Sequence, residues 1–253
     1  MIEVYSVESE LKTVETAMNK EMQFNSSTLD DLLNLPMNNL DRYMSPALVL
    51  SVSCMTGKIS KTILSLATVF QYVFLAHHIH KLITDEDMSE HSRQFPVLTG
   101  DFMFGQTLKK VCQEDIFPYA GQFVKLIKTI NEGILMRWRY KNKRIPFQEY
   151  NMILGNERAS LTALAVKLSA KLSGIPQTYI DKLENFGYCI GMAWAASEEP
   201  ACASILQENL SKAEENLAQI RDYLPIKPLQ ELMEFLSAEI ERNKKAGTGV
   251  LQQ

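Results

Sequence analysis

The chain has 253 residues, of which 46% are hydrophobic and 22% are charged, a composition typical of a globular protein with one sizeable core. Its 26 basic and 30 acidic residues give a formal net charge of -4, so we predict no nucleic-acid partner and no general attraction to anionic lipid. The four cysteines are scattered and form no CxxC pair. This spacing predicts neither a disulfide framework nor a zinc site, and it indicates a reducing, cytoplasmic setting.

The first segments argue against export and against a membrane span. Residues 1–20 carry acidic side chains and lack a basic start followed by an apolar core, so no secretory signal is expected. The most apolar stretch, residues 63–79, is interrupted by Ser65, Thr68, Gln71 and two histidines and falls short of a clean spanning helix of roughly 20 residues. It predicts a buried core helix and no transmembrane segment.

Apolar residues recur at helical spacing along almost the whole chain, and no segment alternates as a strand would. The clearest stripes run from Ile180 to Ala193 and from Leu206 to Leu224. Prolines at positions 36, 46, 96, 118, 146, 176, 200 and 225 predict breaks between about ten helices. We therefore predict an all-α fold with a single domain over residues 1–253, in which residues 246–253 form a frayed, disordered tail.

Several segments fall in the order of the motifs of a known family. They are residues 41–46, residues 81–85, the run Val97-Leu98-Thr99-Gly100-Asp101-Phe102, the pair at 157–158, and residues 194–202. Over residues 38–243 the chain resembles the trans-prenyl diphosphate synthases, with their lysine-rich loop missing. The resemblance implies an isoprenoid-synthase-like helical bundle, shortened relative to active enzymes. In such enzymes two Asp-rich helical faces hold magnesium against an allylic diphosphate.

The first half of the resemblance has lost most of its chemistry. In the GKxxRP-type motif Arg42 falls on the lysine, which makes it a possible diphosphate contact, whereas Ser45 replaces the arginine. The DDxxD motif presents carboxylates four residues apart on one helix face. Here its first positions are Lys81 and Leu82, and only its last acid, Asp85, survives. A single carboxylate beside a lysine is not expected to hold a magnesium cluster.

The second half is also degenerate. The lysine and threonine that contact the allylic diphosphate are replaced by Glu157 and Arg158, and the glutamate would repel a phosphate. The second Asp-rich motif keeps acids at Glu198 and Glu199, but Pro200 interrupts the helix and Cys202 replaces the third acid. Weak magnesium binding by these glutamates stays open beside a purely structural role as an acid pair.

Other clusters have structural interpretations that we favour. The histidines at 77, 78, 80 and 91 form no known zinc pattern. The acids at 85, 86, 87 and 90 are typical of a solvated helix end, although a substitute metal site formed by these acids stays open. The basic run at 137, 139, 141, 143 and 144 is typical of a helix C-terminus, with a basic patch for RNA, membrane phosphate or an acidic partner as the alternative.

The resemblance assigns interface or tunnel positions to two helices. On the first helix they are Phe70, Phe74, Ala76 and His77, where Ala76 is compatible with long products; on the second, Val97 to Leu108, they include Phe102 and Phe104.

We interpret the chain as the small, noncatalytic, component I type subunit of a heterodimeric heptaprenyl or hexaprenyl diphosphate synthase for quinone side chains. It would be inactive alone, without catalytic residues, metal or cofactor of its own. A catalytic large subunit would supply magnesium and share a tunnel for the polyprenyl chain, and the small subunit could form a homodimer when alone. The alternatives are a divergent homodimeric synthase that uses Asp85, Glu198 and Glu199, and a helical protein that binds an isoprenoid without reacting it.

Overall fold

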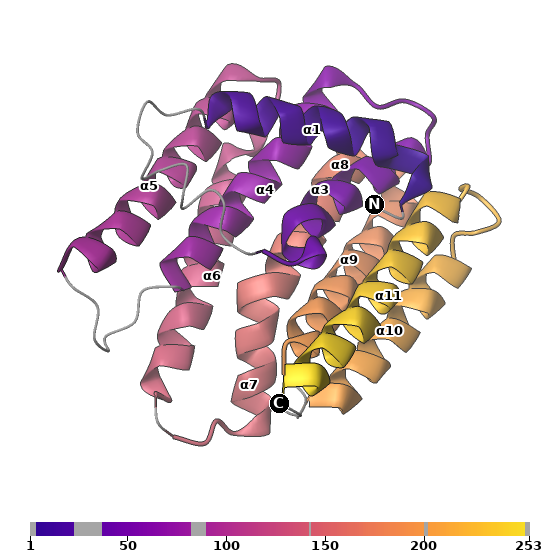
Figure 1. Cartoon of the computed structure of the whole chain (residues 1–253). Coiled ribbons are helices and arrows are strands. Elements are labelled where there is room, and N and C mark those ends of the chain that lie inside the picture. Colours follow the sequence, from indigo (N-terminus) through magenta and orange to yellow (C-terminus); the bar gives the residue numbers. More distant parts are fainter. Residues whose placement is uncertain (1–3, 23–36, 82–89, 142, 200–201, 251–253) are drawn as a thin grey trace.

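A computed structural model describes residues 4–22, 37–81, 90–141, 143–199 and 202–250, and in this part of the chain all regular structure is helical (Figure 1). The all-α prediction is therefore confirmed. The α-helices are α1 (Glu8–Glu21), α3 (Asn39–Cys54), α4 (Lys61–Lys81), α5 (Glu90–Gln113), α6 (Ala120–Arg139), α7 (Phe147–Leu154), α8 (Ser160–Leu172), α9 (Gln177–Ser197), α10 (Ala203–Ala218) and α11 (Lys227–Val250). Short turns of other helix types are η1 (Tyr5–Val7), η2 (Phe117–Tyr119) and η3 (Gly155–Ala159).

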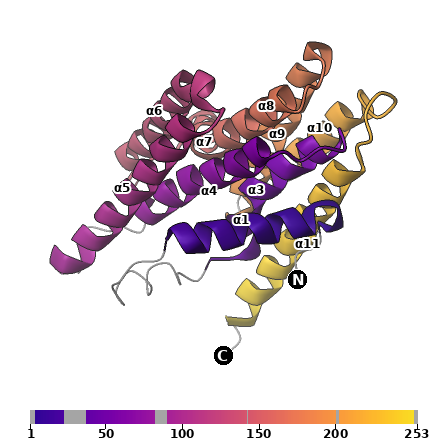
Figure 2. The ribbon, with the colours of Figure 1, turned by 90° about the horizontal axis from the view of Figure 1, so that it is seen from above.

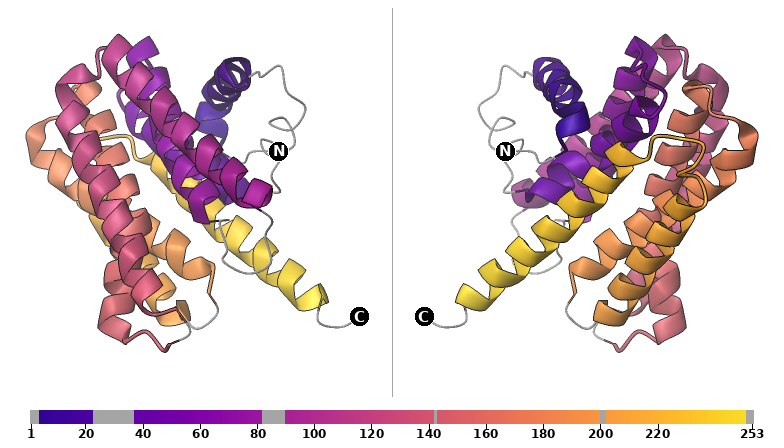
Figure 3. Two further views of the ribbon diagram at one scale, coloured as in Figure 1. Left: turned by 90° about the vertical axis from the view of Figure 1, so that its left-hand side faces the viewer. Right: turned by 90° about the vertical axis from the view of Figure 1, so that its right-hand side faces the viewer.

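Helices α3, α4, α8 and α9 form the middle of the bundle. Helix α4 packs against α3, α5 and α8, while α9 packs between α8 and α10. Seen from above, α5 and α6 lie on one side of the bundle and α10 and α11 on the other (Figure 2). Helix α11 packs along α3 and extends past its neighbours at its C-terminal end (Figure 3).

Helix α4 is the central core helix that the apolar stretch predicted. By length and composition it could also cross a membrane, and it is the one such helix among the described residues. However, 83% of its apolar window is buried inside the fold, because its residues are apolar on all sides and neighbouring helices surround it. The stripe on α9 also faces the core, since Ile180, Leu183, Phe186, Ile190 and Ala193 are all buried. In the stripe that follows it, Leu206, Ala213, Leu217 and Ile220 are buried, whereas Leu210 and Leu224 are half-buried.

Two predicted breaks were wrong. Pro46 lies inside α3 and Pro96 lies inside α5. A proline in a helix costs one backbone hydrogen bond and about 3 kcal/mol. In α3 the burial of the residues on both sides of Pro46 offsets this cost. Helix α11 extends to Val250. Residues 251–253 lie outside the described residues, so the frayed tail expected over residues 246–253 stays a prediction.

Glycines bring the segment η3 close to its neighbours. A Cβ atom at Gly133 of α6 would lie 2.9 Å from Cγ of Glu157, and one at Gly191 of α9 would lie 2.6 Å from Cα of Ala159. Both distances are shorter than real Cβ contacts, so these two helices can approach η3 only because they carry glycine there. The side chains of η3 are thereby placed in the centre of the bundle.

Candidate functional site

The segment η3 is a π-helical turn, and it places two charged side chains in the core. Such turns insert a residue into a helix and are frequent at functional sites. Glu157 and Arg158 follow each other in this turn, and each is only 4% exposed. A buried charge is costly unless it is paired and hydrogen-bonded, so the partners of these two residues decide what the site can do.

Arg158 is held by aromatic rings and by carboxylates. Its guanidinium carbon lies 3.9 Å from the ring centroid of Trp194 and 4.8 Å from that of Phe74. One Nη atom donates to Oε1 of Glu198 at 2.7 Å, and the other lies 3.5 Å from Oδ1 of Asp41. A guanidinium is weakly hydrated and stacks well on aromatic faces, which suits it to this dry position.

Glu157 is paired with two cations from different helices. Arg137 of α6 donates Nε to Oε1 at 2.9 Å and Nη2 to Oε2 at 3.2 Å, a two-bond geometry, and Lys81 Nζ at the end of α4 lies 3.0 Å from Oε2. Arg137 also reaches Oε1 of Glu199 at 3.5 Å. Burial opposes the charge of Arg137, but its bonds with Glu157 outweigh this and raise the pKa of Arg137.

We call these residues the central ion-pair network. It consists of Asp41, Lys81, Arg137, Glu157, Arg158, Glu198 and Glu199. Burial raises the pKa of Asp41 above its ordinary value, although the nearby Arg158 lowers it. The charges therefore nearly cancel within the network, with cations supplied by the chain itself.

The three histidines of α4 lie in different surroundings and do not converge. His77 is buried, and its ring nitrogens have no hydrogen-bond partner among the described residues. Burial, together with Lys81 and Arg158, lowers the pKa of His77 well below its ordinary value, and burial lowers that of His78. His80 instead contacts α5, with Nε2 3.3 Å from the carbonyl oxygen of Val97. Across the described ranges, no three His, Cys, Asp or Glu side chains lie together as a metal site would require.

The structure brings some of the predicted site residues together and separates others. Lys81 pairs with Glu157, and Arg137 joins Glu157 to Glu199. Glu198 pairs instead with Arg158. Leu82 and Asp85 lie outside the described residues, as do most of the acids proposed as a substitute metal site. Arg42 is not in the network and pairs with Glu15 of α1 at 3.7 Å.

Cys202 lies next to the network, because its backbone N–H donates to the carbonyl oxygen of Glu199 at 3.0 Å. It is a free, buried cysteine before α10, and with Tyr150 and Glu199 it lines an open pocket of ≈ 620 Å³. Helix α9 ends at Ser197, so Glu198 and Glu199 follow the helix and do not stack along it. Pro200, which was predicted to interrupt this helix, lies outside the described residues.

The predicted interface and tunnel residues divide between interior and surface. Phe70, Phe74, Ala76 and His77 are buried within the bundle of one chain. The ring of Phe70 lies 5.3 Å from that of Phe123, and the ring of Phe74 lies 5.0 Å from that of Trp194. On α5, Phe102 and Phe104 are half-buried.

Sequence reasoning missed three members of the site. Asp41 was passed over for its neighbour Arg42, Trp194 was taken only as a motif position, and Arg137 was interpreted as part of a solvated helix end. In the structure Arg137 is 30% exposed and tied to Glu157. The signal was the acid at position 157, because a buried glutamate requires nearby cations.

Comparisons with known proteins agree with this fold. No family model matches the chain. It is 24% identical over 175 residues to "Heptaprenyl diphosphate synthase component 2" of Geobacillus stearothermophilus, an alignment that covers 63% of this chain. The chain spans about half of the length of that relative, 53%.

Two solved structures show the same architecture. The crystal structure of a polyprenyl synthase from Caulobacter crescentus, complexed with calcium and isoprenyl diphosphate, superposes with a TM-score of 0.77 at 16% identity over 92% of this chain and 96% of the other. A geranyl diphosphate synthase small subunit from Antirrhinum majus superposes with a TM-score of 0.65 at 15% identity over 85% and 91%. The chain therefore has the all-helical fold of the polyprenyl synthases, and its sequence is similar to prenyl transferases at low identity.

Proposed function

We propose that this chain is the noncatalytic subunit of a two-component long-chain prenyl diphosphate synthase. The observation that carries the proposal is the central ion-pair network. The catalytic centre of a prenyl diphosphate synthase needs carboxylates that are free to bind magnesium and cations that are free to bind diphosphate. Here Glu198 is bonded to Arg158, and Glu157 is bonded to Arg137 and Lys81.

Replacing these internal partners with magnesium and diphosphate would be costly. Arg158 would have to leave the rings of Trp194 and Phe74, or a metal would have to bind beside a buried guanidinium. Breaking a buried ion pair by removing one partner costs about 3–5 kcal/mol. The network therefore supports a structural role for this region and leaves ionisation of the substrate to a partner, which would supply the Asp-rich motifs and the magnesium.

The surface of α5 and α6 supports the presence of such a partner. Several large apolar side chains are exposed on these helices and on the turn between them, for example Leu98 at 65% and Val124 at 62%. The set comprises Val97, Leu98, Leu108, Phe117, Val124, Leu135 and Trp138. A contiguous patch of exposed apolar residues is typical of protein interfaces, and we propose that these residues form one.

Two glycines on the same helices point the same way. A Cβ atom added at Gly105 of α5 or at Gly121 of α6 would meet no atom within 4 Å. The fold of this chain therefore does not need glycine there, although glycine inside a helix costs about 0.5–1 kcal/mol relative to alanine. Close approach of helices from a second chain would explain both positions, and we assign this surface to the catalytic subunit.

The test uses the purified chain with an intact DDxxD synthase as partner. With magnesium, isopentenyl diphosphate and farnesyl diphosphate, we expect no product from this chain alone. We expect a mixed complex on gel filtration, and longer products from that complex than from the partner alone. Product from the isolated chain would instead support the divergent enzyme, and failure to form a complex with a synthase encoded beside it would contradict the proposal.

A pair of surface variants makes this test specific. Leu108→Arg and Val124→Arg each place a charge on the proposed interface, and we expect each to weaken the mixed complex at least about tenfold, since an unpaired buried charge costs more than 1.4 kcal/mol. Tyr223→Arg serves as the matched control, because Tyr223 is exposed too, at 68%, but lies after α10. Equal weakening by the control would argue against this surface.

A further inference from the structure

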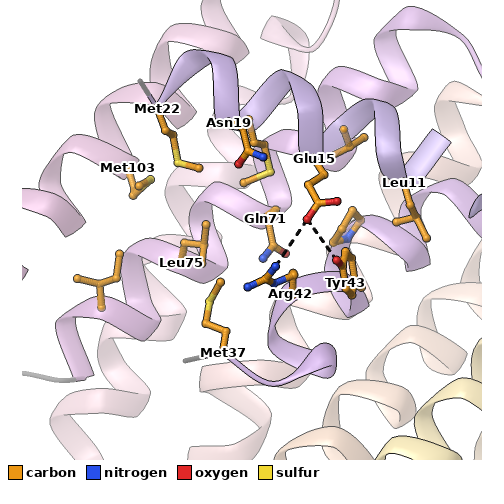
Figure 4. Close-up of a pocket in the computed structure, with 14 residues that line it drawn as sticks. Leu11, Glu15, Asn19, Met22, Met37, Arg42, Tyr43, Gln71, Leu75 and Met103 are labelled. Carbon is orange, nitrogen blue, oxygen red and sulfur yellow. Dashed lines mark hydrogen bonds and ion pairs between the residues drawn. The ribbon is translucent and has the colours of Figure 1, made fainter. Parts of the chain in front are cut away.

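A second cavity lies between α1, α3, α4 and α5, and no side chain of the central ion-pair network lines it. It has a volume of ≈ 200 Å³, and its walls combine aliphatic and thioether side chains with a few polar groups (Figure 4). The lining consists of Leu11, Val14, Glu15, Met18, Asn19, Met22, Met37, Arg42, Tyr43, Pro46, Gln71, Leu75, Ile79 and Met103. Apolar cavities on the order of 150 Å³ are large enough to bind a molecule such as benzene.

The polar and apolar parts of this cavity are separated. Glu15, Arg42 and Asn19 are half-buried or exposed at its rim, whereas Leu75 and Ile79 are buried in its floor. At the rim Arg42 pairs with Glu15 at 3.7 Å, and the hydroxyl of Tyr43 donates to the same carboxylate oxygen at 3.2 Å. The rim is therefore locally neutral and gives no preference for an ionic ligand.

Gln71 is the unusual group of the floor. Its side chain is 2% exposed, and its Nε2 donates to the backbone carbonyl oxygen of Asp41 at 2.9 Å. Because that acceptor fixes which end of the amide is the nitrogen, the other end must be the oxygen. Oε1 of Gln71 has no hydrogen-bond partner among the described residues. An unpartnered buried acceptor costs about 1–3 kcal/mol, and a donor supplied by a ligand would recover part of that cost.

We propose that this cavity binds a small neutral amphiphile, an aliphatic chain that carries one hydroxyl group. The chain would lie against Leu75, Ile79 and the methionines, and the hydroxyl would donate to Oε1 of Gln71. Methionine is unbranched and flexible, so four methionines in one lining suit a chain without a rigid shape. A carboxylate lacks the donor that Gln71 needs and would lie near Glu15. The site is independent of the proposed synthase partner.

The test follows the methionine methyl groups by NMR in the full chain labelled with ¹³C. With 1-octanol as the probe, we expect the signals of Met18, Met22, Met37 and Met103 to shift, and that of Met152, which is exposed on α7, to stay. The methyl ether of 1-octanol has the same chain without the donor. It should bind about threefold to tenfold more weakly, the effect of one hydrogen bond. Octanoate should bind more weakly than the alcohol as well.

Two variants distinguish the effect of the hydrogen-bond acceptor on Gln71 from the effect of the cavity volume. Gln71→Met keeps the volume and removes the acceptor, so it should bind the alcohol and the ether equally. Leu75→Phe fills the floor and should abolish the shifts with either probe, and it reports on the site even if the Gln71 variant does not fold. Equal affinity of the unmodified chain for alcohol and ether, or shifts of methionines outside the cavity, or no shifts at all, would overturn the proposal.

Discussion

The centre of the bundle and the exposed sides of α5 and α6 differ in which side chains they bury and which they expose. In the centre, charged side chains such as Glu157 and Arg158 are buried and matched by partners within the chain. On α5 and α6, large apolar side chains such as Leu98 and Val124 lie exposed. A protein that binds an ionic substrate by itself needs charged groups that are free to bind that substrate. This contrast is the basis of our proposal that the central charges are occupied internally and that the exposed surface contacts another protein.

The largest effect is expected from removing the guanidinium at the centre. Arg158→Leu would leave Asp41 and Glu198 without their cation. Asp41 is buried but Glu198 is 43% exposed, so water offsets part of the loss. We expect the free energy of unfolding, measured with urea, to fall by about 2–4 kcal/mol. The matched control is Lys167→Ala at the pair with Glu184, 2.8 Å apart and partly exposed, where the expected loss is below about 1 kcal/mol. Equal losses in the two variants would mean that the ion pairs at the centre stabilise the fold no more than an ion pair at the surface.

A smaller loss is expected when the other buried charge is neutralised. Glu157→Gln leaves Lys81 and Arg137 with a weaker acceptor, and because both cations are 30% exposed, water offsets part of the loss, leaving about 1–3 kcal/mol. Arg137→Met should cost a similar amount. The double variant should cost less than the sum of the two, because each removes the same pair. Additive losses would contradict direct coupling between these residues.

The histidines of α4 should make stability depend on pH. In the folded chain the pKa of His77 is well below its ordinary value of 6.5, so below pH 6.5 the unfolded state binds the proton and the folded state does not. Stability therefore falls as pH falls through 6.5, by at most about 1.4 kcal/mol per pH unit for one histidine. Urea unfolding of the unmodified chain should show this slope between about pH 7.5 and about pH 5, a range that spans the ordinary pKa of histidine.

His77→Leu is the matched variant for the pH dependence. It should lower the slope of stability against pH below pH 6.5, and His78, whose pKa is also lowered, should account for part of what remains. Because the nitrogens of His77 have no partner among the described residues, the variant should lose little stability at neutral pH. An unchanged slope would mean that His77 does take up a proton in the folded state.

The smallest effect concerns the exposed helices. Gly105→Ala and Gly121→Ala should each stabilise the isolated chain by about 0.5–1 kcal/mol, because alanine is the better helix former and neither Cβ meets another atom. Thermal unfolding of the isolated chain measures this gain. Gly191→Ala serves as the contrast, since its Cβ would lie 2.1 Å from Oγ1 of Thr162, and there we expect a loss of stability. Destabilisation at Gly105 or Gly121 would show that the chain itself needs these glycines.

Local patterns were sufficient to predict most of the helices. The apolar run that became α4 and the stripe that became the buried face of α9 are properties of nearby residues. Pro146 and Pro176 stand directly before α7 and α9, as expected of residues that cannot continue a helix. Pro46 and Pro96 could not be predicted in the same way, because whether a helix tolerates a proline depends on what packs against it.

The sequence by itself determined the all-helical fold and the scarcity of acids at the motif positions, because helix periodicity and residue type are read along the chain. Only the tertiary structure decided what the remaining charges do. Lys81, Arg137 and Glu157 come from α4, α6 and η3, and no local rule joins residues so far apart. From the sequence, Glu157 was a charge that would repel phosphate; in the fold it is the partner of two cations. That difference arises because the energy of a charge depends on its neighbours in space and on its burial.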